Sequence, residues 1–149
     1  MRTIVTFQSD RFNNTESHEY FMNAHCFGDD VCKWMIEQLE KNGIKCDAEP
    51  GQEDFGWYFN FSVDDKKHCF VCSFRWPDDD HHGIWIGWIE RSVSLISSLF
   101  GGRERGIDPM ALRKIHELLA RTPGISDVRW HHKSEFDRGN EVAGKSDPD

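Results

Sequence analysis

The chain has 149 residues, 38% of them hydrophobic and 13% aromatic, and a formal net charge of −8 at pH 7. This length predicts one domain, and the excess of acidic residues argues against binding to nucleic acid or to an anionic membrane. The five cysteines are an odd number, and neither a signal-peptide pattern nor a long apolar run is present. These features favour a cytoplasmic protein with reduced thiols.

The first half of the chain begins with a predicted strand over residues 2–8, where apolar side chains alternate. A helix is expected over residues 29–42, because apolar side chains recur there every three or four positions. Asp29 or Asp30 is suited to cap the N-terminus of this helix. Residues 44–48 are expected to form a short edge strand.

An aromatic pattern then dominates the sequence. Over residues 55–63 large aromatic side chains alternate with small or polar ones, which is typical of a half-buried strand. Residues 67–76 are its expected hairpin partner, and residues 84–89 add a third strand to an antiparallel meander. Directly before the first of these strands, residues 51–54 form a predicted turn that carries two carboxylates.

The second half returns to helical spacing. Residues 91–100 fit a short helix, and a second main helix is expected over residues 109–121, preceded by Asp108 as its cap. A last strand is predicted over residues 125–130. From residue 133 onward no apolar periodicity remains, so residues 133–149 are expected to be a disordered C-terminal tail.

Together these elements predict one α+β domain over residues 1–132. The expected architecture is an antiparallel sheet of about four to six strands with the two main helices on one face. The order of the elements suggests a ferredoxin-like βαββαβ arrangement with insertions.

Short motifs occur along most of the chain outside the tail. They are FN at residues 12–13, YFMN at 20–23, CFGDD at 26–30, EPGQEDFGWYF at 49–59, IGWIER at 86–91 and VRW at 128–130. This pattern resembles a family of small bacterial proteins of unassigned function. The resemblance implies a bacterial, soluble, single-domain protein and implies no activity.

Metal binding is the first chemistry to weigh. His68, Cys69 and Cys72 superficially match half of a zinc site. Side chains at positions 69 and 72 of a strand point to opposite faces, so buried thiols are the favoured reading. The histidines of residues 80–82 and 131–132 fall in a predicted turn and at the end of a strand. We therefore expect no bound metal.

Nucleophilic catalysis is the second. Cys26 follows His25 and precedes the first helix, where the positive helix end lowers a thiol pKa. The flanking aspartates oppose thiolate formation, and sequence neighbours seldom form a catalytic dyad, so a packed side chain is favoured. Neither a nucleophile-elbow motif nor a nucleotide fingerprint is present, and we expect no cofactor.

Two other groups of residues are candidates for a site. Glu53 and Asp54 precede the aromatic strand and are expected to bond Arg75, Arg91 or backbone N–H groups. If they serve a ligand instead, an acid beside aromatic rings has a raised pKa and acts as a proton donor.

The tryptophans form the second group, because Trp57 and Trp88 belong to the same predicted sheet. A sheet with helices on one side exposes its other face unless another element covers it. The sequence supports an open aromatic face and a face covered by the 91–100 helix equally. The candidate ligand- or partner-binding residues are therefore Glu53, Asp54, Trp57, Arg75, Trp88 and Arg91.

Two functions follow from these candidates. The first is a small cytoplasmic binding or regulatory module without catalytic activity, which uses an aromatic-rich sheet surface for a protein partner or a small-molecule ligand. The alternative is a small-ligand-binding protein or enzyme with a polar site at Glu53, Asp54 and nearby arginines.

Overall fold

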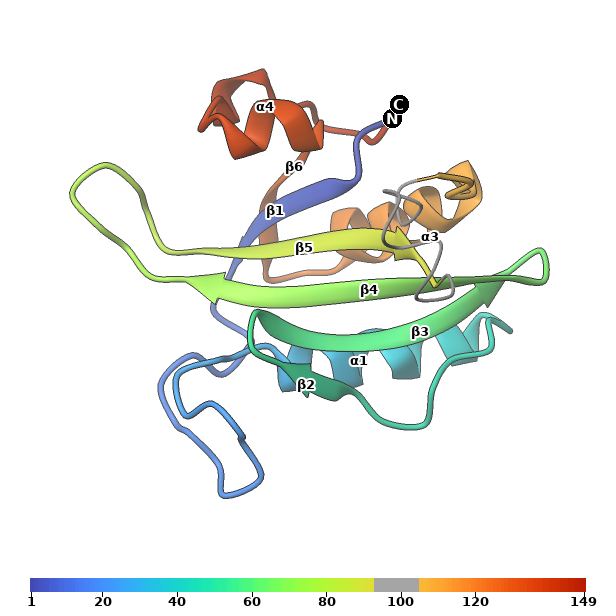
Figure 1. Ribbon diagram of the computed structural model, residues 1–149, viewed down its shortest axis with the longest axis horizontal. Helices are drawn as coiled ribbons and strands as arrows, with labels where there is room; N and C mark the ends of the chain where they lie inside the picture. The colour runs from blue at the N-terminus through green and yellow to red at the C-terminus, as the bar shows by residue number, and fades with distance from the viewer. Residues whose placement is uncertain (93–104) are drawn as a thin grey trace.

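The computed structural model describes residues 1–92 and 105–149 and has an α+β fold (Figure 1). Helices α1 (Asp29–Lys41) and α3 (Pro109–Arg121) lie on the same face of one antiparallel sheet. This confirms the predicted class and the placement of the two main helices. The helix predicted over residues 91–100 lies outside the described residues beyond residue 92.

The sheet has six strands in the order β2-β3-β4-β5-β1-β6. Their bounds are β1 Ile4–Ser9, β2 Gly51–Glu53, β3 Gly56–Val63, β4 Lys66–Arg75, β5 Ile84–Arg91 and β6 Ile125–His131. Strands β2 to β5 form a meander, and β1 lies between β5 and β6. The ferredoxin-like order is not confirmed by this arrangement and stays a prediction.

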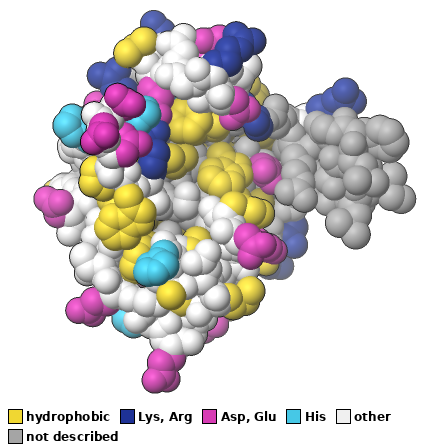
Figure 2. Space-filling view, turned by 60° about the vertical axis from the view of Figure 1, so that its left-hand side comes forward, with side chains coloured by type: hydrophobic (Ala, Val, Ile, Leu, Met, Phe, Trp, Pro, Cys, Tyr) yellow, Lys and Arg dark blue, Asp and Glu magenta, His cyan; other side chains and the backbone are white. Residues whose placement is uncertain are grey.

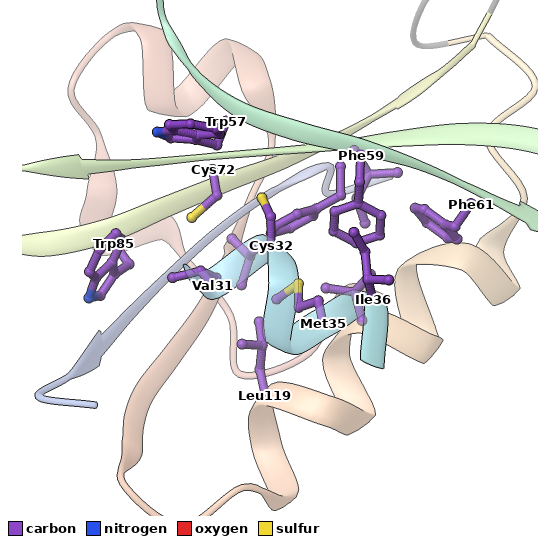
Figure 3. Packing of buried hydrophobic residues seen from close by; sticks show 14 of the residues in the cluster. Val31, Cys32, Met35, Ile36, Trp57, Phe59, Phe61, Cys72, Trp85 and Leu119 are labelled. Atoms are coloured by element: carbon purple, nitrogen blue, oxygen red, sulfur yellow. The ribbon is translucent and has the colours of Figure 1, made fainter. Parts of the chain in front are cut away.

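The core lies between the sheet and the two helices, as Figure 3 shows. Aromatic side chains of β3 point toward α1, and Phe59 is fully buried with its ring centroid 5.7 Å from that of Phe70 on β4. The alternating aromatic pattern is therefore the helix-facing half of the strand, because successive side chains of a strand point to opposite faces. Leu119 brings α3 into the same core.

The helix ends are formed by different residues than the sequence pattern suggests for α1. Its N-cap is Gly28, with no capping bond from a side chain, and Asp30 instead accepts hydrogen bonds from the backbone N–H groups of Asn13 and Val31. Asp108 caps α3 as predicted and accepts a hydrogen bond from the Met110 N–H at 2.9 Å.

The segment between α1 and β3 corrects two further expectations. Residues 44–48 do not form a strand, and their pairing with the sheet is a single bridge between Cys46 and Phe61. The edge strand is β2, which occupies most of the predicted 51–54 turn. Glu53 pairs with Gly56, so Asp54 and Phe55 form the tight turn of a β-hairpin.

The C-terminal segment, residues 133–149, differs from the expected disordered tail. It contains the short helix α4 (Lys133–Asp137) and the 3₁₀-helix η1 (Glu141–Ala143), and Lys145 pairs with Trp130 at the outer edge of β6. The segment shows no apolar periodicity because individual contacts, and not an apolar stripe, hold it on the sheet. Both chain termini lie side by side near α4 (Figure 1).

Within the described residues, no helix combines the length and the apolar character needed to cross a membrane.

Candidate functional site

The face of the sheet opposite α1 and α3, here called the open face, carries a row of side chains across five strands. Strand register places Tyr58, Val71, Trp88, Ile4 and His131 next to one another in this order. Most of these side chains are apolar. The open face of the sheet is therefore apolar along its middle, where a solvated face would be polar.

A hollow of about 460 Å³, here called the main hollow, lies on this face under α4. Its apolar lining comes from Ile4, Phe55, Ile86, Trp88 and Phe136. Lys133 and Asp137 of α4 line its border and form an ion pair. Figure 2 shows hydrophobic side chains inside a hollow that acidic and basic side chains surround.

Phe55 and Trp88 form the aromatic centre of the main hollow. Phe55 belongs to the β2–β3 turn, is 52% exposed, and places its ring centroid 5.8 Å from that of Trp88. The Trp88 Nε1–H group donates a hydrogen bond of 3.1 Å to Glu90, which fixes the indole on the sheet. The turn thus brings an exposed ring onto the open face.

A second hollow, here called the acidic hollow, adjoins the first and has a volume of about 330 Å³. It shares Phe55 and Glu90 with the main hollow and adds Tyr58 and the exposed Glu53. The two hollows together form one surface along β3, β4 and β5. Apolar and aromatic groups make up most of this surface, and Glu53, Glu90 and Asp137 contribute its carboxylates.

A third, polar cleft of about 350 Å³ lies at the other end of the strands, between the 80–82 loop, β6 and η1. Arg75, which lines this cleft, forms a bidentate ion pair with Glu141 of η1. The second contact, from Nη2 to Oε2, is 3.2 Å. The hydrogen bond from Arg75 lowers the pKa of Glu141 below its ordinary value. The pair fastens the C-terminal segment to β4.

His131 lies beneath the C-terminal segment and is 2% exposed. Its Nε2 atom is 2.9 Å from the hydroxyl of Thr6, and its ring packs against Phe136 with centroids 5.2 Å apart. Burial lowers the pKa of His131, while the nearby Glu141 opposes this effect. Burial therefore favours the neutral form of this histidine, which packs between β6 and α4.

The structure separates the residues that the sequence analysis combined into one site. Trp57 faces the helices, is 5% exposed, and donates a hydrogen bond of 2.8 Å from Nε1 to the Cys26 carbonyl. Trp88 faces the opposite way, on the open face. Trp57 is therefore part of the core and supports the loop before α1, so it does not belong to the candidate surface.

The charged candidates do not meet either. Glu53 and Asp54 are exposed, and neither carboxylate has a hydrogen bond or ion pair with another residue in the described part of the chain. Arg75 pairs with Glu141, and Arg91 donates to the Lys67 carbonyl at 3.2 Å. Among the described residues, the prediction that these acids bond Arg75, Arg91 or backbone N–H groups is therefore wrong.

The thiols of Cys26 and Cys72 match their predicted role as packed side chains, whereas Cys69 is only partly buried. Cys32 and Cys72 are buried, and burial raises the pKa of both thiols well above the ordinary value. Burial also raises the pKa of Cys26, which works against a thiolate nucleophile there. Among the described residues, no group of three or more His, Cys, Asp or Glu side chains is arranged to hold a metal ion.

Sequence reasoning missed the contribution of Phe55, Phe136 and Glu141 to the open face. Phe55 continues the alternating aromatic pattern, so periodicity assigns it to the core, whereas the hairpin turn directs it to the opposite side. The nearest signal for Phe136 is that it is a single large apolar residue in an otherwise polar tail.

The fold and the site together define an α+β protein with an aromatic-lined hollow on one face of its sheet. Comparisons with protein-family models, curated proteins and solved structures gave no match to the chain.

Proposed function

We propose that the protein is a small cytoplasmic binding or regulatory module without catalytic activity, which binds its ligand or partner on the open face of the sheet. The observation that supports this proposal is the pair of the exposed Phe55 and the partly buried Trp88 in the main hollow. An exposed aromatic ring that borders a preformed hollow favours binding, because a bound ligand removes the apolar surface of the ring from contact with water. We also propose that the protein is a bacterial protein of the family that its short motifs resemble.

The size of the main hollow favours a small molecule over a large protein surface. Ligand pockets commonly have volumes of about 300–1,000 Å³ and an apolar lining with a few polar groups. At about 460 Å³, with Ser73, Thr3 and Glu90 among apolar neighbours, the main hollow fits this description. A protein partner that inserts one apolar side chain would use the same surface.

The alternative function is a small-ligand-binding protein or enzyme with a polar site at Glu53 and Asp54. One observation favours it, since Glu53 lines the acidic hollow beside Tyr58. The arginines that this alternative requires lie elsewhere, Arg75 on Glu141 and Arg91 on a backbone carbonyl. Binding through the aromatic surface is therefore the better supported of the two.

A neutral fluorescent probe, N-phenyl-1-naphthylamine, tests the proposal by titration into the purified protein. We expect saturable binding of about one probe per chain, because the main hollow has room for one small apolar molecule. Phe55→Ala is expected to weaken binding at least about fivefold, a loss that corresponds to roughly 1 kcal/mol of aromatic contact.

Met22→Ala is the matched control, because Met22 is an exposed apolar residue of the loop before α1 and lines none of the three hollows described above. It is expected to leave probe binding unchanged. The proposal fails if the wild-type protein shows no saturable binding, or if Phe55→Ala and Met22→Ala bind the probe equally well. If the probe binds as expected, native mass spectrometry of protein purified from its source cell would identify the natural ligand.

A further inference from the structure

We propose that the occupant of the main and acidic hollows is a small amphipathic organic cation, such as an amine or a quaternary ammonium compound with an apolar body. This inference rests on the proposed function and adds the chemical class of the ligand.

The apolar body of such a ligand fits the main hollow. Phe55, Ile86, Trp88 and Phe136 line it from three sides: the β2–β3 turn, the sheet and α4. Contact with these side chains favours an apolar ligand body, whatever the charge of the ligand's head group. The main hollow by itself therefore does not distinguish cations, anions and neutral molecules.

The charged groups of the lining make that choice. Among the described residues that line the two hollows, the carboxylates are Glu53, Glu90 and Asp137, whereas the one ammonium group is that of Lys133. Lys133 is already ion-paired with Asp137. The acidic hollow contains no basic residue in its described lining, and Glu53 has no ion pair with a described residue. The net charge of −8 adds a long-range attraction for cations.

Aromatic rings lie beside the Glu53 carboxylate. Phe55 and Tyr58 line the acidic hollow together with Glu53, and Trp88 lies next to Phe55. The face of an aromatic ring attracts a cation through its quadrupole, and a methylated ammonium group is especially suited to such contacts. Rings and a carboxylate around one hollow therefore favour a positive head group over a neutral one.

An anionic ligand is disfavoured by the position of the arginines. Arg75 and Arg129 line the polar cleft at the other end of the strands, outside the main and acidic hollows. Each is already paired with a carboxylate, Arg75 with Glu141 and Arg129 with Asp127. A negative head group in the acidic hollow would face Glu53 and Glu90 instead.

Three probes with the same tail test the inference: octyltrimethylammonium, octanol and octanoate. Each competes with N-phenyl-1-naphthylamine for the wild-type protein. We expect octyltrimethylammonium to bind about three- to tenfold more tightly than octanol, from ring contacts and one exposed ion pair. Octanoate is expected to bind more weakly than octanol, and higher salt is expected to reduce both differences.

Glu53→Gln isolates the charge, because it keeps the size of the side chain. It is expected to reduce the preference for octyltrimethylammonium over octanol about two- to fivefold, the range of an exposed ion pair. Glu40→Gln is the matched control, since it makes the same change of net charge on an exposed position of α1, on the helix side of the sheet. It is expected to leave the preference unchanged.

The inference is overturned if octanol binds as tightly as octyltrimethylammonium, or if Glu53→Gln keeps the full preference. In both cases octanol still displaces the fluorescent probe, so the binding function itself stands. Equal binding of octanol shows that the charge class is wrong, and a full preference in Glu53→Gln shows that its assignment to the Glu53 carboxylate is wrong. If the fluorescent probe does not bind the wild-type protein at all, the proposed function fails together with this inference.

Discussion

Phe59→Ala is expected to destabilise the protein strongly, whereas Phe55→Ala is expected to have little effect, although both residues follow the same aromatic alternation. Phe59 is 0% exposed, and its ring packs against Phe61 and Phe70 at centroid distances of 5.9 and 5.7 Å. Removing a fully buried phenyl ring costs about 3–5 kcal/mol through lost burial and the cavity left behind. Phe55 is 52% exposed, and its loss is expected to cost at most about 1 kcal/mol.

Thermal unfolding followed by circular dichroism measures both variants under one set of conditions. For a domain of this size, 1 kcal/mol shifts Tm by about 2–4 °C. Phe59→Ala is then expected to lower Tm by roughly 6–20 °C, and Phe55→Ala by no more than about 4 °C. Equal shifts for the two variants, or a shift of less than about 3 °C for Phe59→Ala, would refute the assignment of these residues to opposite faces.

Three further predictions concern other parts of the fold. His68 accepts a hydrogen bond from the Asp108 N–H at 3.0 Å, and burial lowers its pKa. Because the unfolded chain then binds the proton more readily, the free energy of unfolding should fall as pH drops below about 6.5. His68→Leu should flatten this slope in urea titrations, and a slope unchanged from wild type would contradict the reasoning. Gly87→Ala places its Cβ 2.6 Å from the Phe70 ring, so urea titration should show a loss of about 1–3 kcal/mol; an unchanged midpoint would mean that the strands adjust freely. Glu141→Gln removes the ion pair with Arg75 and should speed amide hydrogen exchange in the C-terminal segment while costing at most about 1 kcal/mol overall. Unaltered exchange there would show that the pair does not fasten the segment.

Much of the fold was predictable because it depends on local periodicity. Alternating burial in β3 and β5 follows the sequence alternation, and α1 and α3 have single apolar stripes that require one surface to pack against. The Asp108 cap was predictable for the same reason, since its hydrogen bond reaches a residue two positions away. Such features are decided within a few residues of the chain.

The candidate site was less predictable because it depends on contacts between distant parts of the chain. Arg75 meets Glu141 across a separation of 66 residues, and nothing in the pattern of either region indicates the pairing. Trp57 and Trp88 were combined because both belong to the sheet, yet the two side chains face opposite sides. A hydrophobic period gives the faces within one strand, but only strand register relates the faces of two strands.

The two edges of the sheet bear on how the protein behaves at high concentration. An exposed edge strand offers unpaired backbone groups to a neighbouring molecule and so promotes aggregation. Strand β2 has three residues, and at the opposite edge Lys145 exchanges two backbone hydrogen bonds with Trp130, of 2.6 and 2.8 Å. A short strand at one edge and a covering segment at the other thus limit edge-to-edge pairing between the sheets of neighbouring molecules. Deleting the C-terminal segment as a tail would therefore expose the backbone groups of β6 that Lys145 now pairs.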